Sequence, residues 1–80
     1  MFNQFKLMDY TNYIESRPDI MLGKPVIKGT RITVELIIQK LSEGASHEQL
    51  IEAYPSLTSE NILAALAYAS EVISNETLIA

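Results

Sequence analysis

Two residues that end helices, Gly44 and Pro55, divide residues 34–80 into three segments. The segment before Gly44 repeats apolar residues at i, i+3, i+4 and i+7, which is the spacing of one buried helix face. These residues are Val34, Ile37, Ile38 and Leu41. We therefore expect a first helix over residues 34–43, which Gly44 ends because glycine readily adopts the left-handed conformation that follows helix C-termini.

The two later segments begin with helix start signals. Ser46 and Gln49 have the Ser-x-x-Gln spacing of a capping box, which predicts a second helix from Ser46 to Tyr54. Leu57 and Ile62 stand at the two positions of a hydrophobic staple, which predicts a third helix that begins after residue 58 and continues to about residue 75. Three helices joined by short connections predict a mainly α fold, a trihelical helix-turn-helix bundle.

Helical periodicity assigns the residues of the third helix to two sides. The inward side is expected to hold Ile62, Ala65, Leu66, Ala69, Val72 and Ile73. The exposed side is expected to hold Glu60, Asn61, Ala64, Ala67, Glu71 and Ser74. Leu63 and Tyr68 also fall outside the inward arc, and the exposed side has no Lys or Arg, so we do not expect this helix to read duplex DNA.

The residues before the helices predict a short β-hairpin. Gly23-Lys24-Pro25 is expected to be a turn, because glycine accepts a positive φ and proline fixes its own φ. The β-branched run that follows suits a strand over residues 25–28, paired with residues 13–16. Gly29 then lets the chain change direction, and either Thr30 or Thr33 can cap the first helix.

Chain length and composition indicate one small domain. We expect it over residues 12–75, with apolar tails at residues 1–11 and 76–80. A chain of this size buries only about 60% of its unfolded surface. Since 48% of the residues are hydrophobic, we expect a homodimer to cover apolar surface that one core cannot hide.

Charge is distributed unevenly along the chain. Every lysine and arginine lies in residues 1–40, whereas the charged residues of 41–80 are all glutamates. Lys24, Lys28 and Arg31 form what we call the basic edge, beside backbone N–H groups at Gly29 and Thr30 that can meet phosphate. These residues are the candidate nucleic-acid site. The alternative is that the glycines and the proline only turn a hairpin into a helix.

The sequence does not predict an enzyme or a cofactor. The sole histidine, His47, has Glu48 and Glu52 near it, which is too small a ligand set for a metal site and includes no nucleophile. We expect His47 to be an exposed first-turn residue. The chain has no cysteine, and its longest apolar run is far shorter than the roughly 20 residues that span a bilayer, so we expect a cytoplasmic protein without a membrane segment.

Several blocks of the sequence resemble a known family. The run GKPVIKGTRITV at residues 23–34 resembles the signature of the family called domain of unknown function 433. Residues 44–50, 54–58 and 64–69 are similar to its other blocks. The family usually has two glycines before the lysine, where this chain has Leu22 and Gly23. The resemblance implies a homeodomain-like trihelical fold and a role as a VapB-type antitoxin, encoded beside a PIN-like nuclease toxin.

The resemblance gives the acidic half of the chain a function. We expect the chain to bind and neutralise a basic PIN-like nuclease, and to bind its own operator DNA through the basic edge of a dimer. The alternative is a dimeric DNA-binding regulator, or an adaptor, without a toxin partner. The candidate partner-binding residues are Phe2, Phe5, Leu36, Leu63, Tyr68, Glu71, Leu78 and Ile79.

Overall fold

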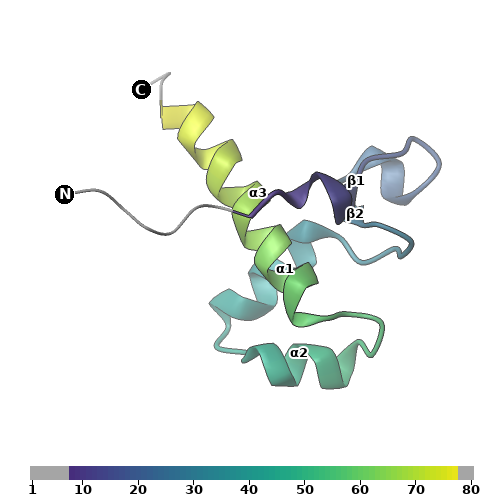
Figure 1. Ribbon diagram of the computed structural model, residues 1–80, viewed down its shortest axis with the longest axis vertical. Coiled ribbons are helices and arrows are strands. Elements are labelled where there is room, and N and C mark those ends of the chain that lie inside the picture. Colours follow the sequence, from purple (N-terminus) through teal and green to yellow (C-terminus); the bar gives the residue numbers. More distant parts are fainter. Residues whose placement is uncertain (1–7, 78–80) are drawn as a thin grey trace.

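The computed structural model describes residues 8–77, with side chains described up to residue 75. Within this range a two-stranded hairpin precedes three helices, as the sequence predicts (Figure 1). The strands are β1 (Ile14–Glu15) and β2 (Val26–Ile27), and the helices are α1 (Val34–Ser42), α2 (His47–Ala53) and α3 (Ser59–Thr77). Two single 3-10 turns, η1 (Tyr10–Asn12) and η2 (Met21–Gly23), flank β1.

The hairpin is shorter than predicted, with two residues in each strand. The strands are antiparallel, with Ile14 opposite Ile27 and Glu15 opposite Val26. Val26 and Ile27 are both buried, so β2 belongs to the core. A lone pair of strands is marginal in water, and this packing on the helices is what supports it.

The turn between the strands begins two residues earlier than expected. Met21, Leu22 and Gly23 all have positive φ, at 48°, 59° and 84°. Leu22 therefore adopts the left-handed conformation at the position where the family that the sequence resembles usually has glycine. Its side chain is 94% exposed, so no packing compensates for the strained backbone.

Thr33, not Thr30, caps α1. The Thr33 hydroxyl accepts a hydrogen bond from the backbone N–H of Leu36 at 3.0 Å. The Thr30 hydroxyl instead donates to the carbonyl of Ile27 and accepts from the N–H of Ile32, which stabilises the turn after β2. Both hydroxyls thus bond to nearby backbone groups, and the helix begins at Val34.

The predicted capping box at α2 is confirmed. The Ser46 hydroxyl accepts from the Gln49 N–H at 3.0 Å, and the Gln49 side chain accepts from the Ser46 N–H at 2.8 Å. The start of α3 uses the same reciprocal arrangement between Thr58 and Asn61, at 3.1 and 3.0 Å, which the sequence analysis did not identify. Threonine followed three residues later by asparagine was the available signal.

The core lies where the three helices meet β2. Its buried residues are Ile27, Val34, Ile37, Leu50, Leu57, Ile62 and Ala65. Every one of the three helices contributes, and the two residues of the predicted staple are both included. In the part of the chain that the structure describes, no helix is long and apolar enough to cross a membrane.

Candidate functional site

Lys24, the first residue of the basic edge, is paired within the chain. Its Nζ lies 2.9 Å from Oε1 of Glu35, which is in the first turn of α1. Both side chains are more than half exposed, so the pair adds little stability. It does place a carboxylate beside a cation that we predicted to contact phosphate, and Lys24 is therefore a weaker phosphate ligand than the sequence indicated.

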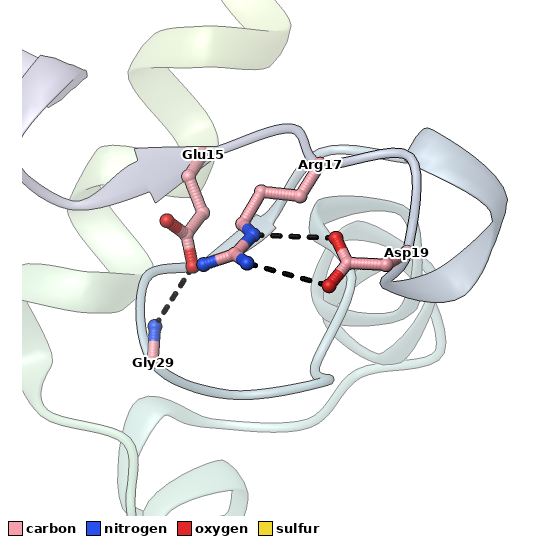
Figure 2. Close-up of polar contacts among 4 residues, drawn as sticks. All are labelled: Glu15, Arg17, Asp19 and Gly29. Carbon is pink, nitrogen blue, oxygen red and sulfur yellow. Dashed lines mark hydrogen bonds and ion pairs between the residues drawn. The ribbon is translucent and has the colours of Figure 1, made fainter.

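The glycine loop of the basic edge is also satisfied internally. Gly29 has a φ of 81°, and its N–H donates to the Glu15 carboxylate at 3.2 Å (Figure 2). The Thr30 N–H donates to the carbonyl of Ile27 at 2.9 Å. The two backbone donors that we expected to meet phosphate are thus already bonded to oxygens of the same chain, and a phosphate on the loop would have to displace Glu15.

Sequence reasoning missed Glu15 as a member of this site. The predicted hairpin already put residues 13–16 beside residues 25–28, and the antiparallel register carries the Glu15 side chain to the loop after β2. The hairpin pairing was therefore the signal that a carboxylate would face the loop. Glu15 lies outside the continuous stretch of sequence that forms the basic edge, so its contact with the loop depends on the pairing of two separate segments.

A second internal pair lies on the same side of the hairpin. The Arg17 guanidinium donates to both carboxylate oxygens of Asp19, each at 3.3 Å, as Figure 2 shows. These hydrogen bonds hold the pKa of Asp19 below its ordinary value. Both side chains are largely exposed, so the pair contributes little to stability. It does leave Arg17, a further cation near the loop, paired with a carboxylate.

Lys28 and Arg31 are what remains of the predicted nucleic-acid site. Both are exposed, and within residues 8–75 neither makes an ion pair. The backbone of Lys28 is fixed, because its N–H donates to the carbonyl of Tyr13 at 2.8 Å. Two cations per chain provide few phosphate contacts, and phosphate neutralisation supplies most of the affinity for nucleic acid.

The predicted sides of α3 are partly wrong. Leu66, Val72 and Ile73 were expected to face inward, yet they are 40%, 39% and 59% exposed. Ala64 and Ala67 were expected to be exposed, yet they are buried. Two features of the fold explain why these residues are exposed or buried contrary to the prediction.

The first feature is the N-terminal segment, which covers the side of α3 that was assigned to solvent. Tyr10 of η1 packs edge-on against Tyr68, with ring centroids 5.3 Å apart. The Tyr10 hydroxyl also donates to the Glu71 carboxylate, and this hydrogen bond raises the pKa of Tyr10. Tyr68 and Glu71, both predicted to be available for a partner, therefore contact the chain's own N-terminal segment.

The second feature is the difference in helix length. α3 has 19 residues, whereas α1, the helix it packs against, has 9. At a rise of about 1.5 Å per residue, α1 can cover only about half of α3. Figure 1 shows the C-terminal half of α3 projecting beyond α1 and α2, so the apolar residues of that half have no core to enter.

An open apolar groove results between α1 and the C-terminal half of α3. Its volume is about 610 Å³. The apolar residues that line it are Pro25, Val34, Ile38, Tyr68, Ala69, Val72 and Ile73, and the polar ones are Glu35, Gln39 and Ser42. We call this feature the α1–α3 groove. Sequence reasoning identified most of its apolar residues but assigned them to the core.

The remaining candidate partner residues occupy other positions. Leu63 is 47% exposed on α3, and Leu36 is half-buried on α1. Phe2, Phe5, Leu78 and Ile79 lie outside the described residues.

The structure also places the residues considered for catalysis. His47 is the first residue of α2 and is half-buried, not exposed as expected. In the part of the chain that can be assessed, no group of three or more His, Cys, Asp or Glu side chains could hold a metal ion.

Comparisons with known proteins agree with the fold. A family model described as "Protein of unknown function (DUF433)" matches residues 14–69. The uncharacterized protein y4eO of Sinorhizobium fredii (strain NBRC 101917 / NGR234) is 43% identical over 56 residues, which are 70% of this chain and 25% of that protein. The crystal structure of a DUF433 member protein from Anabaena variabilis ATCC 29413 is similar, with a TM-score of 0.75 and 31% identity, over 81% of this chain and 64% of that one. The chain thus spans less than two thirds of either relative.

Proposed function

Because the chain belongs to the DUF433 family of proteins of unknown function, we propose a role that rests on its own surfaces: it is a cytoplasmic antitoxin that binds and neutralises a PIN-like nuclease toxin. The single observation that carries this proposal is the α1–α3 groove, an open apolar surface on the longest helix of the chain. The resemblance noted in the sequence supplies the class of partner.

Charge supports a basic partner. Residues 41–80 contain no Lys or Arg, and Glu60 and Glu71 on α3 are both exposed. A nuclease that acts on RNA must offer positive charge to a polyanion. Complementary charge speeds the encounter of two proteins and disfavours wrong partners, so an acidic helix suits such a nuclease.

Shape and polarity of the groove indicate what the partner inserts. Its floor is aliphatic and aromatic, and its polar residues stand on the α1 side. Open apolar grooves between helices commonly take the apolar face of an amphipathic helix. We therefore propose that the toxin contributes such a helix, with cationic residues on its polar face.

Binding to operator DNA remains a second part of the proposal, with a narrower basis than the sequence suggested. Lys28 and Arg31 are the cations of the basic edge that carry it, because Lys24 is paired with Glu35. Two copies of the chain would double these contacts. Autoregulation of this kind would be weak and strongly dependent on salt.

Co-expression tests the antitoxin proposal. The tagged chain is produced together with the product of the neighbouring reading frame, and light scattering measures the molar mass of the purified material. We expect a complex of defined stoichiometry and relief of growth arrest caused by the nuclease. Recovery of the chain without the nuclease, and no relief of arrest, would contradict the proposal.

A pair of matched variants locates the contact. Val72→Gln removes apolar surface from the groove without adding charge, and we expect it to weaken the complex at least about 10-fold. Leu22→Gln makes the same kind of change at a more exposed leucine outside the groove, and should leave the affinity unchanged. Equal losses in both variants would show that the groove is not the contact surface.

A further inference from the structure

Another cavity lies at the hairpin turn, apart from the α1–α3 groove. Its volume is about 330 Å³, near the lower end of the cavities that bind small molecules. It is lined by Pro18, Asp19, Met21, Leu22, Lys24 and Arg31, and none of these residues lines the groove. We call this cavity the turn pocket.

Backbone hydrogen bonds fix the two segments that line the turn pocket. On one side, three backbone hydrogen bonds close the turn of residues 17–24, at 3.0, 3.0 and 3.1 Å. On the other side, the loop that carries Arg31 is closed by the N–H of Ile27, which donates to the carbonyl of Ile32 at 2.9 Å. The pocket is therefore formed before a ligand arrives, which reduces the entropy cost of binding.

Two cations and one carboxylate line the turn pocket. In the described part of the chain, Arg31 makes no ion pair and Lys24 makes only the exposed pair with Glu35, which adds little stability. Both oxygens of the Asp19 carboxylate already accept hydrogen bonds from the Arg17 guanidinium, each at 3.3 Å. The positive charges of Lys24 and Arg31 can therefore turn to a ligand at small cost.

The other three residues form an apolar wall of the pocket. Pro18, Met21 and Leu22 are all exposed, and the last two have a positive φ, at 48° and 59°. Backbone of this strained kind, which a residue with a side chain rarely adopts, is common at ligand sites. The sulfur of methionine makes favourable contacts with aromatic rings, so a planar aromatic group suits this wall.

We propose that the turn pocket binds a small phosphomonoester with a planar aromatic body, of the class of the nucleoside 5′-monophosphates. A phosphomonoester carries about 1.5 to 2 negative charges at pH 7, which matches the two cations better than the single charge of a phosphodiester. In the complex Arg31 and Lys24 contact the phosphate, and Lys24 leaves Glu35 to do so. The aromatic body packs on the apolar wall. The inference does not rest on the antitoxin proposal, because the pocket and the groove share no lining residue.

Nuclear magnetic resonance titration of the isotope-labelled chain with adenosine 5′-monophosphate is the test. We expect saturable shifts of the backbone amides of residues 19–24 and 31, with a dissociation constant on the order of 1 mM or lower. Inorganic phosphate lacks the aromatic body and cyclic 3′,5′-adenosine monophosphate is a diester, so each should bind at least about 5-fold more weakly. Absence of saturable shifts in residues 19–24 would overturn the proposal. Equal affinity for the cyclic diester would also overturn it, and would indicate the phosphodiester backbone of a nucleic acid as the ligand.

Matched substitutions separate the turn pocket from the rest of the basic edge. Lys24→Gln and Arg31→Gln should each weaken the binding of adenosine 5′-monophosphate about 10-fold, because each removes a charged hydrogen-bond donor to the phosphate. Lys28→Gln removes the same charge at an exposed residue that does not line the pocket, and should change the affinity less than about 2-fold. Equal losses in all three variants would overturn the proposal, since a general attraction of the basic edge for anions would then account for binding.

Glu35→Gln tests the exchange of partners by Lys24. This substitution releases Lys24 but changes no residue that lines the turn pocket. It should raise the affinity for adenosine 5′-monophosphate about 2- to 5-fold, because an exposed ion pair no longer competes with the phosphate. Glu43→Gln removes the same charge from the C-terminal end of α1 and should leave the affinity unchanged. An affinity that Glu35→Gln lowers or leaves unchanged would overturn the contact of Lys24 with the phosphate.

Discussion

The basic edge and the C-terminal half of α3 differ in how many of their groups find a partner or a packing contact within the chain. At the basic edge, Lys24 has Glu35 as its partner and the Gly29 N–H has the Glu15 carboxylate. On α3, in contrast, Leu66, Val72 and Ile73 are left in water. Polar groups of the basic edge are thus largely paired within one chain, whereas apolar side chains of α3 remain exposed to water.

This difference indicates which surface is suited to a macromolecular partner. A ligand at the basic edge would have to displace carboxylates that are already in place, which reduces the net gain. A partner on α3 would only remove apolar surface from water, at about 25 cal/mol per Å². We therefore propose that α3 is the main binding surface and that Lys28 and Arg31 form a secondary one.

The largest expected effect separates the covered side of α3 from its exposed side. Ala64→Leu inserts a large side chain where the native one is fully buried, and should lower the free energy of unfolding by about 1–3 kcal/mol. Leu63→Ala, one residue earlier but half exposed, should change it by about 0.5 kcal/mol or less. Urea denaturation measures both. Similar losses in the two variants would contradict the described orientation of the helix.

Removal of the Glu15 carboxylate should make the basic edge resemble what the sequence predicted. Glu15→Thr keeps a residue suited to a strand but cannot reach Gly29, and should cost about 1 kcal/mol of stability. It should also raise the affinity for inorganic phosphate, because the Gly29 N–H becomes available beside Lys28 and Arg31. Isothermal titration with phosphate compares this variant with the unmodified chain. An unchanged phosphate affinity would mean that the loop is no anion site in either form.

Replacement of Leu22 in the hairpin turn should have a smaller effect on stability, and it should stabilise the chain. Leu22→Gly should relieve about 1–2 kcal/mol of left-handed strain but add about 0.5–1 kcal/mol of unfolded-state entropy cost. We expect a net stabilisation of about 0.5–1 kcal/mol, seen as a higher thermal midpoint. Leu22→Ala is the control, because it removes the exposed side chain and retains the strain. If alanine stabilises the chain as much as glycine, the strain is not the cause.

The smallest effect concerns the contact of η1 with α3 at high pH. The hydrogen bond to Glu71 raises the pKa of Tyr10 above its ordinary value of 10.0, so the folded chain holds this proton more tightly than the unfolded chain. The contribution to stability is therefore complete below pH 10.0 and is lost as the pH rises through the raised pKa. Ultraviolet titration of tyrosinate should show that Glu71→Gln lowers this pKa. A pKa unaffected by Glu71→Gln would exclude the hydrogen bond as its cause.

Local signals in the sequence predicted most of the fold. The Ser46–Gln49 capping box, the staple of Leu57 and Ile62 and the punctuation at Gly44 each act within a few residues, and each is found where expected. The hairpin was also predicted, with longer strands than those observed. These features depend on neighbours along the chain, which a single sequence contains.

The candidate site was harder to predict because it depends on distant segments. Helical periodicity predicts one covered side of α3 over its whole length, whereas α1 covers only part of that length and η1 packs on Tyr68 and Glu71 from another direction. The basic edge was judged without the strand that brings Glu15 to Gly29. Helix length relative to its neighbours, and the register of the hairpin, decide which groups stay available.

The central claim is that the C-terminal half of α3 needs a partner and that the basic edge does not. Amide hydrogen exchange of the chain, measured alone and in the co-purified complex with the nuclease, tests it directly. We predict that amides of residues 66–75 gain protection in the complex, while those of residues 24–31 keep the same protection. Equal protection of residues 66–75 in the two samples, or a gain confined to residues 24–31, would contradict the account.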